Sequence, residues 1–248
     1  MRKFRSPVLS SLTIVAALVV LTTSGCAAWR LKQSLELARQ SQPWQASPVP
    51  ASATLLIVGD STAVGTGASA PQASLAGLIS REHPQVQIVN RAKDGARFAD
   101  IARQLEGDQR FDVIVVLGGG NDVIRLTGHE ELQAGIERTA QLARARADTV
   151  ILMPSGNVGN APFFFAPWSW LMTQRSKNLH QLVRSAAASS GAIYVKLYQD
   201  KAADPFAQEP GRLHARVGLH PSDAGYELWY RELDAQAGLA KKLTSLKR

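Results

Sequence analysis

Five short apolar runs, separated by stretches of helical periodicity, constrain the fold of this chain more than any other feature. Most of them are rich in β-branched residues, and they fall at 54–58, 86–90, 113–117, 149–153 and 192–197. Their continuous apolar character is typical of strands that are covered on both faces. Helices are expected at 73–82, 96–105, 130–147, 168–190 and 222–239. This alternation predicts a three-layer α/β/α sandwich around a five-stranded parallel sheet.

The chain divides into one medium-sized domain and shorter flanking segments. Its 248 residues, 45% hydrophobic and 19% charged, are enough to bury a sizeable core. Pro43, Pro48 and Pro50 stand among serine and alanine, which is a composition typical of linkers. We therefore expect a leader at 1–26, a tether and linker at 27–52, the folded domain at 53–240 and a frayed basic tail at 241–248.

Residues 1–26 have the pattern of an export signal peptide. Arg2, Lys3 and Arg5 form a basic start before the apolar stretch 8–21. The tetrapeptide that follows, Thr23-Ser24-Gly25-Cys26, resembles a bacterial lipobox, in which the cysteine is lipidated. It departs from that signal at Thr23, where leucine is usual. An uncleaved anchor helix over about 7–29 and a buried helix are the alternatives.

Either a lipidated Cys26 or an anchor helix would hold the domain on a membrane, outside the cytoplasm and facing the periplasm. Ala27 does not suggest retention at the inner membrane, which favours the outer membrane. Because Cys26 is the only cysteine, no intrachain disulfide can form.

Polar residues stand where expected strands end or a helix begins. Ser61 follows the first strand through a Gly-Asp pair, Asn121 follows the third through three glycines, and His220 precedes the last helix. Each has a plain alternative: a helix cap or turn for Ser61, a turn for Asn121 and a structural imidazole for His220. Together, a hydroxyl, an amide and an imidazole are the groups that acyl transfer requires.

Four blocks in chain order resemble those of the SGNH (GDSL-type) hydrolase family. They are Gly59-Asp60-Ser61, the Gly95 block, Gly119-Gly120-Asn121-Asp122 and His220-Pro221, and they extend over about 55–230. The resemblance implies a flavodoxin-like sandwich and serine-dependent ester hydrolysis that needs no cofactor. It also implies that Ser61 is the nucleophile and His220 the general base. The backbone N–H groups of Ser61 and Gly95 and the Asn121 side chain are then the oxyanion hole.

The chain departs from this family pattern at one position. The family usually carries its triad aspartate three residues before the histidine, where this chain has Val217. Three replacements are open: a backbone carbonyl near Val217 holds the imidazole, Asp204 or Glu209 reaches it, or the protein is catalytically weak. The carbonyl is favoured because it needs no rearrangement. Asp223 begins the following helix and is expected to serve its amino end.

Aromatic residues crowd the segment after the fourth strand. Phe164 and Trp168 are candidate substrate-binding residues, as an apolar wall or lid for an acyl chain, and core packing is the equal alternative. The run from Gly65 to Ala70 matches a dinucleotide fingerprint but begins too far after the first strand. The five histidines lack metal-ligand spacing, and the scattered positive charge, +8 in all, does not favour nucleic-acid binding.

The sequence therefore predicts a membrane-tethered serine ester hydrolase of the cell envelope, of the esterase, lipase-like or O-acetyl esterase kind. Its substrate is left open among a short acyl ester, a lysophospholipid and an O-acetylated carbohydrate, and transfer to another alcohol is also open. The alternative is an envelope binding protein that retains the pocket but has lost efficient chemistry together with the aspartate.

Overall fold

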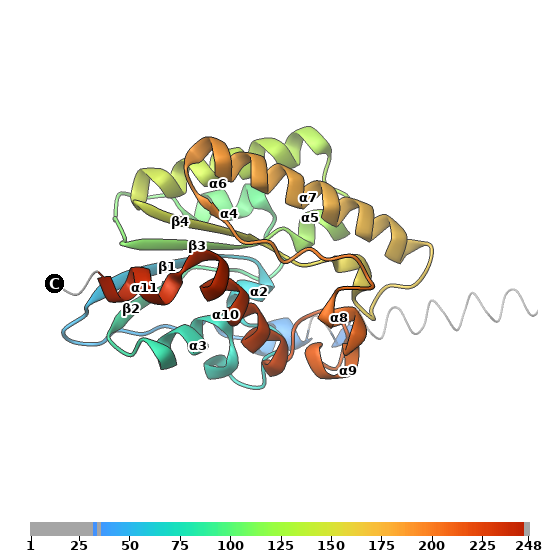
Figure 1. Ribbon diagram of the computed structural model, residues 1–248, viewed down its shortest axis with the longest axis horizontal. Helices are drawn as coiled ribbons and strands as arrows, with labels where there is room; N and C mark the ends of the chain where they lie inside the picture. The colour runs from blue at the N-terminus through green and yellow to red at the C-terminus, as the bar shows by residue number, and fades with distance from the viewer. Residues whose placement is uncertain (1–31, 34–35, 246–248) are drawn as a thin grey trace, which may run out of the picture.

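A computed structural model describes residues 32–33 and 36–245 of the chain (Figure 1). The leader at 1–26, including Cys26, lies outside the described residues. The strands are β1 (Ala53–Gly59), β2 (Val86–Asn90), β3 (Val113–Gly118), β4 (Thr149–Pro154) and β5 (Ile193–Tyr194). The longer helices are α3 (Leu75–Glu82), α4 (Phe98–Gln104), α6 (His129–Arg146), α7 (Trp168–Ser190), α10 (Asp223–Ala237) and α11 (Leu239–Ser245). Short helical turns are α2 (Ser61–Val64), η1 (Pro71–Ala73), α5 (Gly120–Ile124), η2 (Val158–Asn160), α8 (Pro205–Gln208) and α9 (Pro210–Leu213).

The five strands form one parallel sheet in the order β2-β1-β3-β4-β5, which confirms the predicted sheet. β1 and β3 are almost completely covered, and Leu56, Ile57, Val115 and Leu117 have 0–1% of their surface exposed. β5 is shorter than the predicted 192–197, because the chain pairs with β4 over only two residues. Beyond it, the Lys196 N–H donates to the Gln236 side chain of α10 instead of to a strand.

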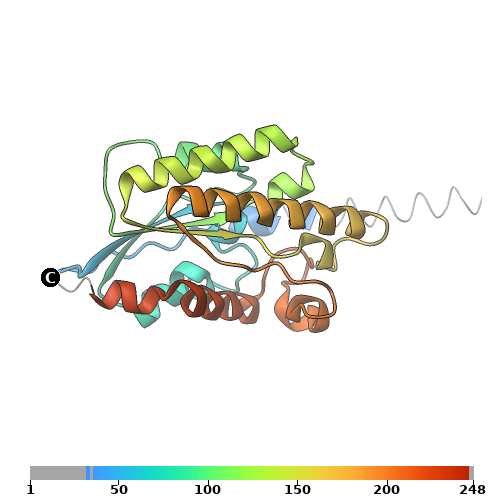
Figure 2. The same ribbon diagram turned by 45° about the horizontal axis from the view of Figure 1, so that its top comes forward.

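Helices cover both faces of the sheet and complete the predicted three layers (Figures 1 and 2). Helices α4, α6 and α7 pack on one face around Leu56, Val58 and Ile114. Helices α3, α10 and α11 pack on the other around Leu55, Ile57 and Val115. Adjacent residues of β1 therefore serve opposite layers, which is the period-two alternation of a strand. Both layers leave the carboxyl edge of the sheet free for the loops that follow β1, β3 and β4.

Two segments expected to be loosely attached are instead held by the domain. In the predicted linker, Ala46 forms an antiparallel bridge with Ile88, and Gln45 exchanges hydrogen bonds with the Asn90 backbone. In the predicted basic tail, residues as far as Ser245 belong to α11, and Leu243 is 2% exposed in the core. Two buried leucines of α11, Leu239 and Leu243, hold this end to the domain, because their burial removes apolar surface from water. Within 32–33 and 36–245, no helix is long and apolar enough to cross a membrane.

Candidate active site

Ser61 stands at the first position of α2, directly after β1. The Asp60 side chain caps this turn, because its Oδ1 accepts hydrogen bonds from the Thr62 N–H (2.9 Å) and hydroxyl (2.6 Å). The Gln104 side chain exchanges two hydrogen bonds with the Gly59 backbone and fixes the end of the strand. At a helix start the first backbone N–H groups have no intrahelical acceptor. The Ser61 N–H therefore has no acceptor within α2, and it lies at the sheet edge beside the hydroxyl of the same residue.

His220 approaches Ser61 from the other end of the chain. The Ser61 hydroxyl and His220 Nε2 are hydrogen-bonded at 3.0 Å, across 159 positions in sequence. A bridge between His214 and Pro221 and the contact with Gly67 hold the histidine segment in place. At Gly67 a Cβ would lie 2.5 Å from the Pro221 carbonyl and 2.9 Å from the His220 Cβ. That glycine, part of the dinucleotide-like motif, is thus needed for close packing behind the histidine.

Burial changes the acid–base properties of the site. It lowers the pKa of His220 from 6.5 to about 4, and the neighbouring His214 adds to the decrease. The ring is therefore neutral at pH 7, as a general base must be. Burial also raises the pKa of Asp60 to about 6, although its hydrogen bonds with Thr62 oppose this. Asp122, which follows Asn121, accepts from the Phe98 N–H at 3.0 Å and orients α5.

No carboxylate or carbonyl holds the second nitrogen of His220. Its Nδ1 is buried and has no hydrogen-bond partner in the part of the chain that the structure describes. The expected hydrogen bond between His220 Nδ1 and a backbone carbonyl near Val217 is therefore not formed. The candidate acids are engaged elsewhere: Asp204 with Asn160 and the Phe206 N–H, Glu209 with Arg212, and Asp223 with Ser69. The structure thus contains a serine–histidine pair rather than a triad.

The predicted oxyanion-hole residues lie on adjacent loops. Asn121 is in α5, directly after β3, and its Nδ2 donates to the Ala96 carbonyl at 3.3 Å. This contact joins it to the loop of Gly95, which has φ = +74°, a conformation that favours glycine. Ser61 and Asn121 line the same cavity, whereas Gly95 is not among its lining residues. The structure therefore brings Ser61, Asn121 and His220 together at one cavity. Gly95 is the residue before Ala96, whose carbonyl accepts from Asn121.

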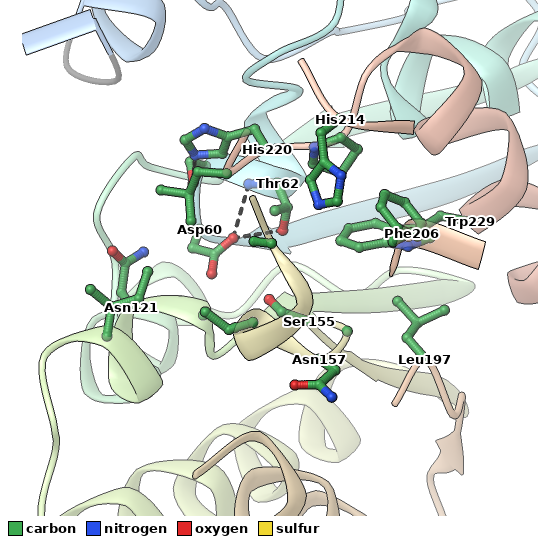
Figure 3. A pocket seen from close by; sticks show the side chains of 18 of the residues that line it. Asp60, Thr62, Asn121, Ser155, Asn157, Leu197, Phe206, His214, His220 and Trp229 are labelled. Atoms are coloured by element: carbon green, nitrogen blue, oxygen red, sulfur yellow. Dashed lines mark hydrogen bonds between the residues drawn. The ribbon is translucent and has the colours of Figure 1, made fainter. Parts of the chain in front are cut away.

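The cavity at Ser61 has a volume of about 90 Å³. Asn121 lies on one side of it, and Phe206 and Trp229 lie on the other, as Figure 3 shows. The sequence interpretation missed several of the lining residues: Ser155, Asn157, Leu197, Phe206, His214 and Trp229. Ser155 and Asn157 come just after the end of β4, and this position after a strand could have indicated that they lie at the site. Nothing local in the sequence marks Phe206 or Trp229 as part of a cavity.

The candidate substrate-binding aromatics lie elsewhere. Phe164 packs against the core beside α7, and Trp168 is 53% exposed at the start of that helix. Neither lines the cavity. No group of three or more His, Cys, Asp or Glu side chains suitable for a metal ion occurs within the described ranges 32–33 and 36–245.

Comparison with known proteins agrees with this geometry. The model of the GDSL-like lipase/acylhydrolase family matches residues 57–228, which include Ser61, Asn121 and His220. The chain belongs to this family. It is a carboxylic ester hydrolase of the SGNH type. No curated protein matches the chain.

Solved structures of similar fold come from several sources. LAE5, an alpha/beta hydrolase from the metagenome of Lake Arreo, Spain, is 21% identical, with a TM-score of 0.61 over 76% of this chain and 96% of its own. TesA is 20% identical, with a TM-score of 0.57 over 78% and 99%. Axe2, an acetylxylan esterase from Geobacillus stearothermophilus, is 22% identical, with a TM-score of 0.55 over 76% and 95%. At these identities the likeness shows that this SGNH hydrolase shares their fold.

Proposed function

We propose that this SGNH hydrolase cleaves short acyl esters through an acyl-enzyme formed on Ser61. His220 Nε2 accepts the Ser61 proton while Oγ attacks the ester carbonyl. The Ser61 N–H, the Gly95 N–H and the Asn121 amide stabilise the resulting oxyanion. The imidazolium returns its proton to the leaving alcohol, and a water molecule, activated by the same histidine, then releases the acid. The single observation that carries this proposal is the 3.0 Å hydrogen bond from Ser61 to His220.

In this proposal, the absence of a carboxylate beside His220 Nδ1 limits the rate of hydrolysis. The neutral His220 must carry its proton on Nδ1 in order to accept at Nε2, and that N–H has no acceptor in the described chain. No negative charge then stabilises the imidazolium that forms as the serine is deprotonated. We therefore expect slow turnover. A chain with no turnover at all would act as the binding protein that is the alternative function.

The size of the cavity supports a short acyl group. Its volume of about 90 Å³ is well below the roughly 300–1,000 Å³ of pockets for drug-sized ligands. Leu197, Phe206 and Trp229 give it an apolar side. Axe2, by its name, acts on acetylxylan. An acetyl ester on a carbohydrate is therefore a substrate class that fits this chain.

The test is hydrolysis of p-nitrophenyl acetate, butyrate and octanoate by the full chain, Ser61→Ala and His220→Ala. We expect turnover to decrease from acetate to octanoate and to be lost in both variants. Equal rates in all three proteins would mean background hydrolysis and would favour the binding protein. A rate that increases toward octanoate would contradict the short-acyl assignment while leaving the serine mechanism intact.

We also propose that the enzyme is tethered to a bacterial envelope membrane through Cys26 and faces the periplasm. The support is the pattern of residues 1–26, with its basic start, apolar stretch and lipobox-like end. Metabolic labelling with a fatty acid should mark the parent and not Cys26→Ser. A labelled Cys26→Ser variant, or recovery of the parent in the cytoplasmic fraction, would overturn the assignment.

A further inference from the structure

Most large apolar side chains exposed by the described residues gather in two segments. These four side chains, here called the apolar rim, are Leu126 (47% exposed), Phe165 (60%), Trp168 (53%) and Trp170 (67%). Leu126 is in the loop after α5, and the others are in the loop before α7 and its first turn. Arg175 of α7 donates to the Thr127 carbonyl, so α7 contacts the loop that follows α5. Exposed clusters of this kind mark interaction sites.

The apolar rim lies beside the mouth of the active-site cavity. Ile124 lines that cavity and is two residues before Leu126, while Ala161 lines it and is four residues before Phe165. In both ribbon views the first turns of α7 project beyond the carboxyl edge of the sheet (Figures 1 and 2). A surface that contacts the rim would therefore face the entrance to the site.

The charges near the rim are mainly positive. No Asp or Glu occurs between Asp148 and Asp200, and the cations of this stretch that follow the rim most closely along α7 are Arg175 and Lys177. On the second segment, Arg125 is exposed next to Leu126. The closest carboxylates along the chain are Asp122, which is buried, and Glu130 and Glu131, and Glu131 pairs with Arg97 at 3.0 Å. Apolar aromatics with neighbouring cations match the interface of an anionic bilayer.

The amino end of the described chain reaches the same edge. Leu37 and Gln40 line a second cavity together with His214, which also lines the active-site cavity. Cys26 is ten positions before Glu36, so the chain between them spans at most roughly 35 Å. A tether at Cys26, as in the proposed localisation, would thus hold this edge close to the bilayer rather than the opposite one.

We propose that the apolar rim inserts into the interface of an anionic lipid membrane and turns the active-site mouth toward it. Trp168 and Trp170 are two positions apart on a helix, so they point about 200° apart around its axis. They do not form one flat platform for stacking on a sugar ring. Tryptophan side chains are enriched at membrane–water interfaces, where no flat stacking platform is needed, and the arrangement therefore favours lipid over carbohydrate.

The experiment measures tryptophan quenching by brominated lipids, with the full chain reconstituted in vesicles of phosphatidylcholine and phosphatidylglycerol. All proteins carry Trp29→Phe, which removes the tryptophan nearest to the tether. The parent is compared with Phe165→Ser/Trp170→Ser and with the control Trp44→Phe, whose partly buried ring packs against the core. Hydrolysis of p-nitrophenyl acetate in detergent is measured for each protein, so that failure of the proposed esterase function is detected separately.

We expect quenching in the parent and in Trp44→Phe, and its loss in the double variant, with unchanged hydrolysis of the soluble ester. Quenching that is equal in the parent and the double variant would overturn the proposal. Quenching that persists when phosphatidylcholine replaces phosphatidylglycerol would overturn the anionic preference. Protection of the parent tryptophans from acrylamide by a soluble xylo-oligosaccharide, without quenching by vesicles, would assign the rim to carbohydrate instead.

Discussion

At the scale of single residues, the chemistry depends on what surrounds His220 Nδ1. The ring has a good contact to Ser61 at Nε2 and none at Nδ1, so it is positioned as a base but not supported as a cation. Val217 occupies the place of the family's aspartate, and it is buried, with 6% of its surface exposed. The family spacing indicates that a carboxylate there would reach the imidazole.

We predict that Val217→Asp raises kcat for p-nitrophenyl acetate by about tenfold or more, because a carboxylate stabilises the imidazolium. It should also raise the pKa of His220 from about 4, and thus move the acidic limb of the pH–rate profile upward. Val217→Asn is the matched control, with a similar shape and no charge. A folded Val217→Asp enzyme with the parent's kcat would show that the absent carboxylate is not limiting.

At the scale of elements, the position of Ser61 depends on how closely the β1–α2 turn approaches β3. A Cβ on Gly59 would lie 1.9 Å from the Leu117 carbonyl oxygen. The Asp60 N–H donates to the same carbonyl at 3.1 Å. This turn cannot move away without breaking the hydrogen bond that positions Asp60 and, through it, the first turn of α2.

Gly59→Ala should therefore lower the free energy of unfolding by roughly 3 kcal/mol or more, since the overlap involves rigid backbone. Urea denaturation measures it. Gly211→Ala in α9 is the control: a Cβ there meets no atom within 4 Å, and the change should stay within about 1 kcal/mol of the parent. Equal midpoints for the two variants would contradict the importance of this close approach.

At the scale of the whole molecule, two buried histidines and the half-buried His214 make folding sensitive to acid. Burial lowers the pKa of His180, His214 and His220 to about 4, from 6.5 in the unfolded chain. Between these values the unfolded chain binds more protons, so stability is full above pH 6.5 and decreases as the pH falls. Asp60, with its pKa raised to about 6, acts in the opposite direction between 3.8 and 6.

We predict a net loss of stability from pH 6.5 to 4, because each of the three histidines costs roughly 3 kcal/mol when fully protonated. Asp60 offsets part of this loss, and so do Asp94, Asp122 and Asp204, whose pKa values burial also raises. Urea midpoints at several pH values would measure the slope. His180→Gln should reduce the slope because it removes one of the three titrating histidines. This position is chosen because it is distant in sequence from Ser61 and the ring bonds to Tyr194 and the Ser155 carbonyl. A midpoint that is constant between pH 6.5 and 4 would contradict the prediction.

The sequence by itself determined the elements and their class. Continuous apolar runs and helical periodicity are local signals, and they placed β2 and α7 at their observed bounds. The motifs around Ser61, Asn121 and His220 also indicated that these three residues lie close together, because strand ends in a parallel sheet converge on one edge. The shortening of β5 and the ordering of the carboxyl-terminal helix depend on contacts with distant residues.

Only the tertiary structure decided the rest of the site. Phe206 and Trp229 come from separate helices and meet at the cavity through packing, which no local pattern records. Whether His220 Nδ1 has a hydrogen-bond partner depends on all the groups that could reach it. Two of these candidates, Asp204 and Glu209, are bound elsewhere. The partner of a side chain depends on which groups the fold brings within hydrogen-bond distance, and these groups can be far apart in sequence. The sequence therefore predicted that Ser61 and His220 act together, and the folded structure determined which groups surround them.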